Sequence, residues 1–109
     1  MGKQLADKSL GEKQRDFMWM ISLLIQRAYE LGYEMSAGDF WAKDGHSKMS
    51  CHYIRLAADI NLFKDGVYLT ETADHEELGI FWEALGGTWG GRFSSPDGNH
   101  YSIEHEGRK

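Results

Sequence analysis

One segment near the start of the chain fixes an element that any fold of this sequence must contain. Apolar residues recur along it at spacings of three and four, at Phe17, Ile21, Leu24, Ala28 and Leu31. This spacing places them on one face of an α-helix. Ser9 and Glu12 have the spacing of a capping box, and Gly32 can take the left-handed conformation that ends a helix. We therefore predict a long helix whose apolar face is covered by the rest of the chain.

A β-hairpin is predicted in the middle of the chain. Apolar and polar residues alternate over residues 55–63, with Asp59 and Asn61 on one face. Alternation with a period of two is typical of a half-buried strand. The Asp-Gly pair at 65–66 is a two-residue turn of the kind that joins antiparallel strands, and residues 67–69 supply the returning strand.

A second helix and a last strand complete the expected elements. Asp74 and Glu77 are spaced to cap a helix that the glycines at 86–87 end. The apolar stripe of this helix consists of Leu78, Phe81, Trp82 and Leu85. A glycine-rich loop reaches residue 91, residues 96–99 form a turn, and residues 100–104 form the last strand.

Length and charge limit the organisation of the chain and its partners. A chain of 109 residues, 41% of them hydrophobic, has the usual size of one domain. We expect one domain over residues 1–109, with a polar tail at about 1–8. The 12 basic residues are scattered and outnumbered by 17 acidic ones, which argues against nucleic acid as a partner.

Cysteine usage and hydropathy bear on where the protein works. Cys51 is the only cysteine, so no intramolecular disulfide forms and the chain suits a reducing compartment. No apolar run approaches the roughly 20 residues of a membrane-spanning helix. The N-terminal residues also lack the apolar stretch of a secretory signal. We expect no membrane insertion and a protein that stays in the cytosol unless another factor releases it.

Two segments carry the residue types that bind zinc, which takes three protein ligands and a water in catalytic sites. His52 and Asp59 are seven residues apart. That separation spans roughly 23 Å on a strand and roughly 10 Å on a helix. The two side chains can share a metal only if residues 53–55 turn the chain back. Spacing alone is therefore a weak indication of a site.

The second segment runs from Asp97 to His100. A turn over these residues brings the two side chains together, so that one can bind a metal and the other can face the water on it. An alternative needs no metal, because Asp and Asn also favour turns by bonding to their own backbone. The residues of the turn alone leave both interpretations open.

Both segments resemble signatures of a known family. Residues 50–59, Ser-Cys-His-Tyr-Ile-Arg-Leu-Ala-Ala-Asp, resemble the Ser-x-His-x-x-Gly-x-Ala-x-Asp signature of zinc peptidases that cut peptidoglycan stem peptides. These peptidases include D-Ala-D-Ala carboxypeptidases and phage L-alanyl-D-glutamate endopeptidases. The Trp-Gly-Gly at 89–91 and the Asp-Gly-Asn-His at 97–100 resemble the second signature. The two motifs have the expected order and separation, which is more specific than either alone.

The resemblance implies a fold and a set of site residues. The fold is α+β, a small antiparallel sheet flanked by helices, as in the hedgehog/D,D-peptidase fold. His52, Asp59 and His100 would hold one Zn²⁺ ion, and Asp97 would act as general base and then as general acid. Ser50 matches a position that helps to hold the substrate. The substrate would be a peptidoglycan stem peptide and the protein a monomer.

The sequence also departs from the family pattern. Arg55 stands where the signature usually has glycine. The family has an upstream arginine that stabilises the oxyanion, and residues 38–43 contain none, so Lys43 or Arg92 is the expected replacement. We also expect Trp89 to line the substrate groove, with packing in the core as the alternative.

Four other residues are assigned to roles outside the metal site. Cys51 is expected to be a buried spacer, His46 and His75 to be solvated, and His105 to lie away from the metal.

The expected function is that of a phage or prophage endolysin that waits in the host cytoplasm and acts on the cell wall after release. One alternative is a zinc-containing wall-binding or scaffold domain with weak or no catalysis, and the absence of the family's arginine from residues 38–43 supports it. Another is an α+β interaction module without metal.

Overall fold

The long helix has the predicted boundaries. In the computed structural model, which describes residues 4–46 and 48–109, α1 runs from Leu10 to Glu30. The Ser9 hydroxyl accepts a hydrogen bond from the backbone N–H of Glu12, and the Glu12 side chain accepts one from the Ser9 N–H. Gly32 then takes a left-handed φ of +90° that turns the chain away from the helix.

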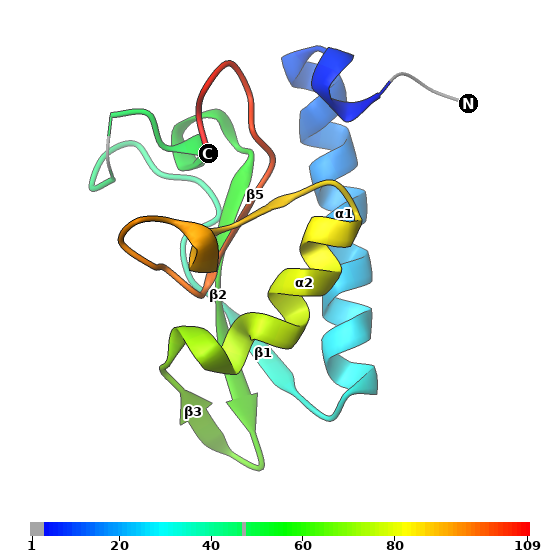
Figure 1. The fold of residues 1–109 in the computed structure, drawn as a ribbon, viewed down its shortest axis with the longest axis vertical. Coiled ribbons are helices and arrows are strands. Elements are labelled where there is room, and N and C mark those ends of the chain that lie inside the picture. The colour runs from blue at the N-terminus through cyan, green and yellow to red at the C-terminus, as the bar shows by residue number, and fades with distance from the viewer. Residues whose placement is uncertain (1–3, 47) are drawn as a thin grey trace.

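A small antiparallel sheet forms around one central strand (Figure 1). This strand, β2 (Ala57–Lys64), pairs with β1 (Glu34–Ala37), β3 (Val67–Leu69) and β5 (His100–Ser102). The two-residue strand β4 (Thr88–Trp89) pairs with β5. The order is β1-β2-β5-β4, and β3 pairs with β2 as the second arm of the predicted hairpin. The predicted α+β class with an antiparallel sheet is confirmed.

The second helix begins later than predicted. The helix α2 spans Glu76–Ala84, and a 3₁₀ turn over Thr72–His75 precedes it. Asp74 does not cap α2, because its carboxylate accepts a hydrogen bond from the backbone N–H of Glu71 at the start of that 3₁₀ turn. Trp82 packs in the core as expected and donates its indole N–H to the carbonyl of Ser102.

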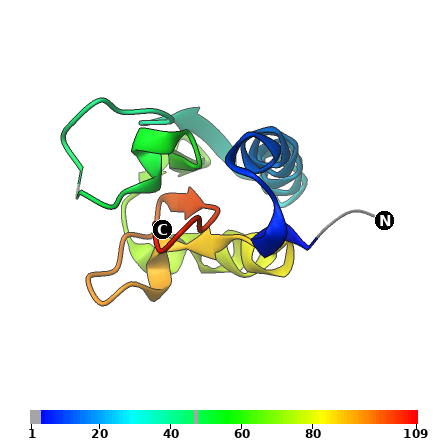
Figure 2. The same ribbon diagram turned by 90° about the horizontal axis from the view of Figure 1, so that it is seen from above.

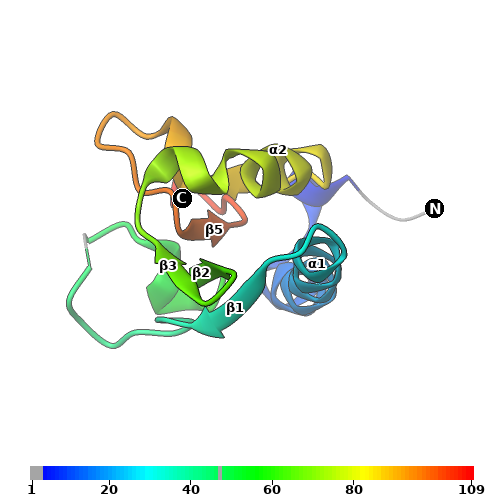
Figure 3. The same ribbon diagram turned by 90° about the horizontal axis from the view of Figure 1, so that it is seen from below.

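The two helices lie on one side of the sheet, and two long connections lie on the other (Figures 1, 2 and 3). These connections are residues 38–46 and 48–56, which follow β1, and residues 90–99, which precede β5. They contain the short 3₁₀ helices η2 (Cys51–Ile54) and η4 (Gly90–Arg92). Between helices and sheet, apolar side chains from both form the core. The residues predicted to bind metal therefore lie on the side away from the helices.

The N-terminal segment is more ordered than predicted. Leu5–Asp7 forms a 3₁₀ turn, and Leu5 packs against the core beside Gly86. Residues 5–7 of the expected polar tail at about 1–8 thus form a turn that contacts the core, and the first three residues of that tail lie outside the described part of the chain. Neither helix in the described part has the length and apolar character needed to cross a membrane.

His75 is buried, contrary to the prediction that it is solvated. Its side chain lies beside Tyr101, with 2.8 Å between the imidazole Nδ1 and the phenol oxygen. Burial lowers the pKa of His75 below its ordinary value of 6.5, and the charge of Asp74 offsets part of this effect. Burial therefore favours the neutral imidazole over the charged one in the folded protein.

The lowered pKa of His75 predicts a loss of stability in acid. Below about pH 6.5 the unfolded chain takes up a proton on His75 before the folded chain does, so the free energy of unfolding falls as the pH falls. For this one group the slope is at most about 1.4 kcal/mol per pH unit. Urea denaturation of the metal-free protein between pH 7 and 5 should show a steeper loss for the native chain than for His75→Gln. Equal slopes would contradict this assignment.

Candidate metal centre

A short helical turn brings His52 next to Asp59. The hydroxyl of Ser50 accepts a hydrogen bond from the His52 backbone N–H at the start of η2. Arg55 then takes a left-handed conformation with φ of 59°, which reverses the chain into β2. The imidazole Nε2 of His52 lies 3.1 Å from the Asp59 carboxylate Oδ1. Arg55 thus adopts, at some cost in strain, a conformation in which glycine is unstrained.

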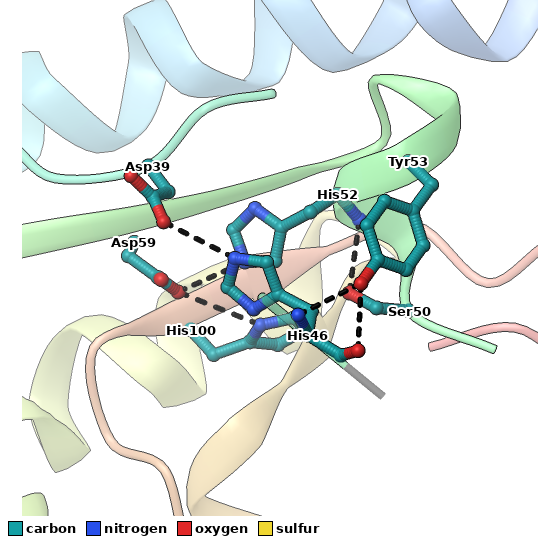
Figure 4. Close-up of polar contacts among 7 residues, drawn as sticks. All are labelled: Asp39, His46, Ser50, His52, Tyr53, Asp59 and His100. Atoms are coloured by element: carbon teal, nitrogen blue, oxygen red, sulfur yellow. Dashed lines mark hydrogen bonds and ion pairs between the residues drawn. The ribbon is translucent and has the colours of Figure 1, made fainter. Parts of the chain in front are cut away.

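Strand pairing brings His100 to the same carboxylate. Asp59 on β2 and His100 on β5 are direct partners in the antiparallel register. The imidazole Nδ1 of His100 lies 3.7 Å from Asp59 Oδ1, and Figure 4 shows the rings of His52 and His100 converging on this oxygen. The three predicted ligands therefore come together from η2, β2 and β5.

The distances and the donor types fit a zinc ion. Ligands at about 2.0–2.1 Å from a tetrahedral zinc are about 3.3–3.4 Å apart. The two nitrogen–oxygen distances, 3.1 and 3.7 Å, lie on either side of that value. The remaining ring nitrogens, His52 Nδ1 and His100 Nε2, are buried and have no hydrogen-bond partner in the described part of the chain. The other nitrogen of each ring faces Asp59 and the candidate metal position, so a bound water, not that ion, is one explanation for these two unpaired atoms.

The electrostatics favour an ionised carboxylate between the two rings. Burial by itself would raise the pKa of Asp59. Hydrogen bonds from His100 and His52, and the positive charge of these rings when they are protonated, lower the pKa of Asp59 by more than burial raises it. The pKa of Asp59 therefore lies below the ordinary value. Asp59 is therefore an anion at neutral pH, which is the form that binds a divalent cation.

Two further residues, His46 and Asp97, each form a potential metal-binding group together with Asp59 and one of the two histidines. His46 joins His52 and Asp59, and Asp97 joins Asp59 and His100, with one donor atom of each residue within 4.8 Å of the others. The prediction that His46 is solvated is wrong, because its ring is half-buried and stacks on His52. No feature of the sequence distinguishes His46, since the loop before η2 carries no motif at this position.

Asp97 lies at the edge of the site in the predicted turn. Its backbone N–H donates to the carbonyl of Gly90, and its own carbonyl accepts from the N–H of His100. Its side chain is exposed and borders two pockets. One, of about 220 Å³, also contacts His52 and His100. The other, of about 210 Å³, lies between the turn and the β3 end of the hairpin. The turn thus presents a free carboxylate beside the candidate ligands.

Gly90 is needed for the close approach of this turn. A Cβ at this position would lie 2.2 Å from the carbonyl oxygen of Asp97 and 2.7 Å from the Cβ of His100. We expect Gly90→Ala to destabilise the fold by about 1–3 kcal/mol, because overpacking displaces backbone. Gly11→Ala is the matched control, since a Cβ there meets nothing closer than 3.6 Å and alanine favours a helix. Denaturant titration of both variants tests this, and an unchanged stability for Gly90→Ala would contradict it.

The predicted substrate-binding residues are only partly near the site. Ser50 lines the pocket beside the histidines, although its hydroxyl also caps η2. In the described part of the chain, neither Lys43 nor Arg92 lines that pocket. Arg92 instead donates two hydrogen bonds of 3.1 Å to the carboxylate of Glu83. The cation that does line it is Lys109, which the sequence did not single out.

Trp89 does not line the groove as predicted. Its side chain is 2% exposed and belongs to the core. Its indole N–H donates to the carbonyl of Gly98 at 2.7 Å. Trp89 therefore supports the turn between Asp97 and His100 from behind, which is the alternative of packing in the core.

Cys51 and His105 lie outside the cluster, as predicted. Cys51 is fully buried beside the carbonyl of Ile103, and burial raises the pKa of its thiol to about 12. A neutral buried thiol is a poor metal ligand. His105 lies 3.1 Å from the Lys13 ammonium, measured from Nδ1 to Nζ, beyond the end of β5.

Comparisons with known proteins identify a family and a similar fold. Residues 43–103, more than half of the chain, match the family model described as D-alanyl-D-alanine carboxypeptidase. The fold is similar to the crystal structure of the L-Ala D-Glu endopeptidase ChiX from Serratia marcescens, with a TM-score of 0.65 and 17% sequence identity. That alignment covers 91% of this chain and 88% of ChiX. No curated protein matches the chain.

Proposed function

We propose that this chain, which belongs to the D-alanyl-D-alanine carboxypeptidase family, is a zinc-dependent peptidase that hydrolyses a peptide bond in peptidoglycan stem peptides. One observation carries the proposal. Two buried imidazoles converge on the carboxylate of Asp59, and a second, exposed carboxylate at Asp97 faces the same pocket. Three ligands with an acid beside them match the needs of metal-assisted hydrolysis.

The proposed chemistry divides between the metal and Asp97. A zinc ion held by His52, Asp59 and His100 would polarise the scissile carbonyl and lower the pKa of a water towards about 7. Asp97 would accept the proton that this water loses as its oxygen attacks the carbonyl carbon. When the carbon–nitrogen bond breaks, Asp97 would pass that proton to the leaving amine. Its exposure leaves the carboxylate free for both transfers.

The position of Asp97 between two pockets favours cleavage within a peptide. The pocket beside the histidines and the pocket beside β3 both border this carboxylate. A peptide bound across it could therefore extend in both directions from the scissile bond. A carboxypeptidase needs room for only one residue on the leaving side. We accordingly favour the L-Ala-D-Glu endopeptidase type over the D-Ala-D-Ala carboxypeptidase type.

Digestion of defined muropeptides, followed by mass analysis, tests both the activity and its type. An endopeptidase should separate the muramyl-alanine part from the remainder of the stem peptide. A carboxypeptidase should instead release only a terminal D-alanine. Intact muropeptides after incubation with the zinc-loaded protein would contradict the proposed function.

A second candidate is a zinc-containing wall-binding or scaffold domain with weak or no catalysis. It is favoured by the positions of Lys43 and Arg92, the two expected replacements for the family's arginine, because neither is among the residues that line the pocket beside the histidines. Zinc binding and sedimentation with purified cell walls, without product release, would support this candidate.

The role of a phage endolysin held in the host cytoplasm until release is also a proposal, and it rests on the likeness to lysis enzymes. Expression inside a bacterial host, with and without a pore-forming protein, tests it, because lysis should require both.

A further inference from the structure

We propose that His46 is a positioning residue that fixes the imidazole of His52 by stacking on its face, and that Asp39 and Tyr53 hold His46 in place. The inference rests on the proposed metal site and adds to it a brace, the three residues Asp39, His46 and Tyr53. Its function would be to raise the affinity of the site for the metal.

The contact between the two rings is extensive. Their centroids are 4.0 Å apart and their planes differ by 17°, so the rings lie face to face (Figure 4). The His52 side chain is 1% exposed, whereas that of His46 is 22% exposed and covers it from the solvent side. His46 thus closes the face of His52 that would otherwise open on the pocket.

The stack compensates for a missing hydrogen bond. A histidine that binds a metal through one nitrogen usually donates its other N–H to a carboxylate or carbonyl, which fixes the ring orientation. The Nδ1 of His52 has no such partner in the described part of the chain. Contact with a flat ring can restrict rotation of His52 in place of that bond, because a tilted imidazole would collide with its neighbour.

Asp39 connects His46 to the strand that carries Asp59. The Nε2 of His46 lies 3.1 Å from the carboxylate Oδ2 of Asp39. The backbone carbonyl of Asp39 accepts a hydrogen bond of 2.7 Å from the N–H of Asp59. One residue therefore orders Asp59 through its backbone and, through its side chain and His46, orders His52.

Tyr53 anchors the backbone of His46 to η2. Its phenol oxygen accepts a hydrogen bond of 2.7 Å from the His46 N–H and donates one of 2.6 Å to the His46 carbonyl. Because Tyr53 follows His52 directly, the brace and the ligand are attached to the same short helix. A movement of η2 would carry both rings together.

A direct role of His46 as a fourth ligand is the competing assignment. Donor atoms of His46, His52 and Asp59 do lie within 4.8 Å of one another. In two nearly parallel stacked rings, however, the nitrogen lone pairs lie in separate parallel planes and do not converge on one point. The observed stack therefore favours support of His52 over ligation.

Zinc affinity, measured by competition with a chromophoric chelator, distinguishes the two assignments. We expect His46→Ala to weaken Zn²⁺ binding about 10-fold, at the lower end of the range for outer-sphere partners. His46→Phe keeps a flat ring but has neither a metal-binding atom nor the contact with Asp39, so it should lose about as much affinity as Asp39→Ala and clearly less than His46→Ala. Asp39→Asn keeps an acceptor for the imidazole N–H and should retain more affinity than Asp39→Ala. Asp44→Ala, which removes an exposed carboxylate from the same loop, is the control and should have no effect.

Each outcome decides one claim. Equal losses for His46→Ala and His46→Phe would make His46 a ligand and overturn the brace, and native affinity in both would overturn it as well. If the native protein itself binds no zinc while remaining folded, the proposed function fails before the brace is tested. The absorption spectrum of the Co²⁺-substituted protein provides a second readout, because loss of a ligand changes the coordination number whereas loss of the brace does not.

Discussion

Replacing Asp97 with alanine is expected to lower kcat by about 100- to 10,000-fold while leaving zinc bound, which is the range for loss of a general acid–base group. The carboxylate is exposed and is not one of the three proposed zinc ligands. The backbone hydrogen bonds of its turn do not involve the side chain, so the turn should survive the substitution. Turnover of a defined muropeptide and zinc content of the same preparation are the two measurements.

The Asp97→Asn variant distinguishes loss of proton transfer from loss of side-chain volume at this position. The amide has nearly the size of the carboxylate but cannot accept the proton, so its loss of kcat should equal that of alanine. A variant at this position with native kcat would remove Asp97 from the mechanism. Zinc lost together with activity would instead make Asp97 a ligand, which its place beside Asp59 and His100 would allow.

Replacing His100 with alanine should abolish both zinc binding and turnover. In the proposed site His100 supplies one of two imidazole ligands, and its loss would leave the Asp59 carboxylate with the ring of His52 alone among the ring partners described here. We expect kcat to fall by at least about 1,000-fold, since without the metal neither the water nor the carbonyl is activated. Metal analysis and the muropeptide assay measure the two effects.

His105→Ala is the matched control for this substitution. His105 follows on the same C-terminal segment but contacts Lys13 and lies outside the cluster. Its removal should leave zinc and turnover within about 2-fold of native, as is usual for substitutions away from a site. If His100→Ala retained a full equivalent of zinc, the ligand assignment would be wrong.

The elements that the sequence predicts well are those with local determinants. The helix from Leu10 to Glu30 is specified by its capping box, its apolar stripe and the glycine after it. The β2–β3 hairpin is specified by alternation and by the Asp-Gly turn, where both residues take left-handed conformations. The strands β1 and β4 could not be predicted in this way. Each is short, neither alternates clearly, and each is defined by its pairing with a strand distant in sequence.

The candidate site could be predicted only through the resemblance. The spacing of His52 and Asp59 does not predict that their side chains meet. They meet because the chain reverses direction at Arg55, whose left-handed backbone conformation is not predictable from an arginine in the sequence. His46 carries no sequence feature and is placed by the loop between β1 and η2. Trp89 and Arg92 belong to the matched motif, yet their contacts with Gly98 and Glu83 are structural and become visible only in the fold.

The central claim is that a zinc ion on His52, Asp59 and His100 enables this chain to cut stem peptides. The most direct test strips the metal with a chelator, returns Zn²⁺ in known amounts and follows cleavage of a defined muropeptide by mass. The account predicts no cleavage by the stripped protein and activity that rises to a plateau at one equivalent of zinc. Cleavage that persists without metal, or a zinc-loaded protein that leaves the peptide intact, would contradict it.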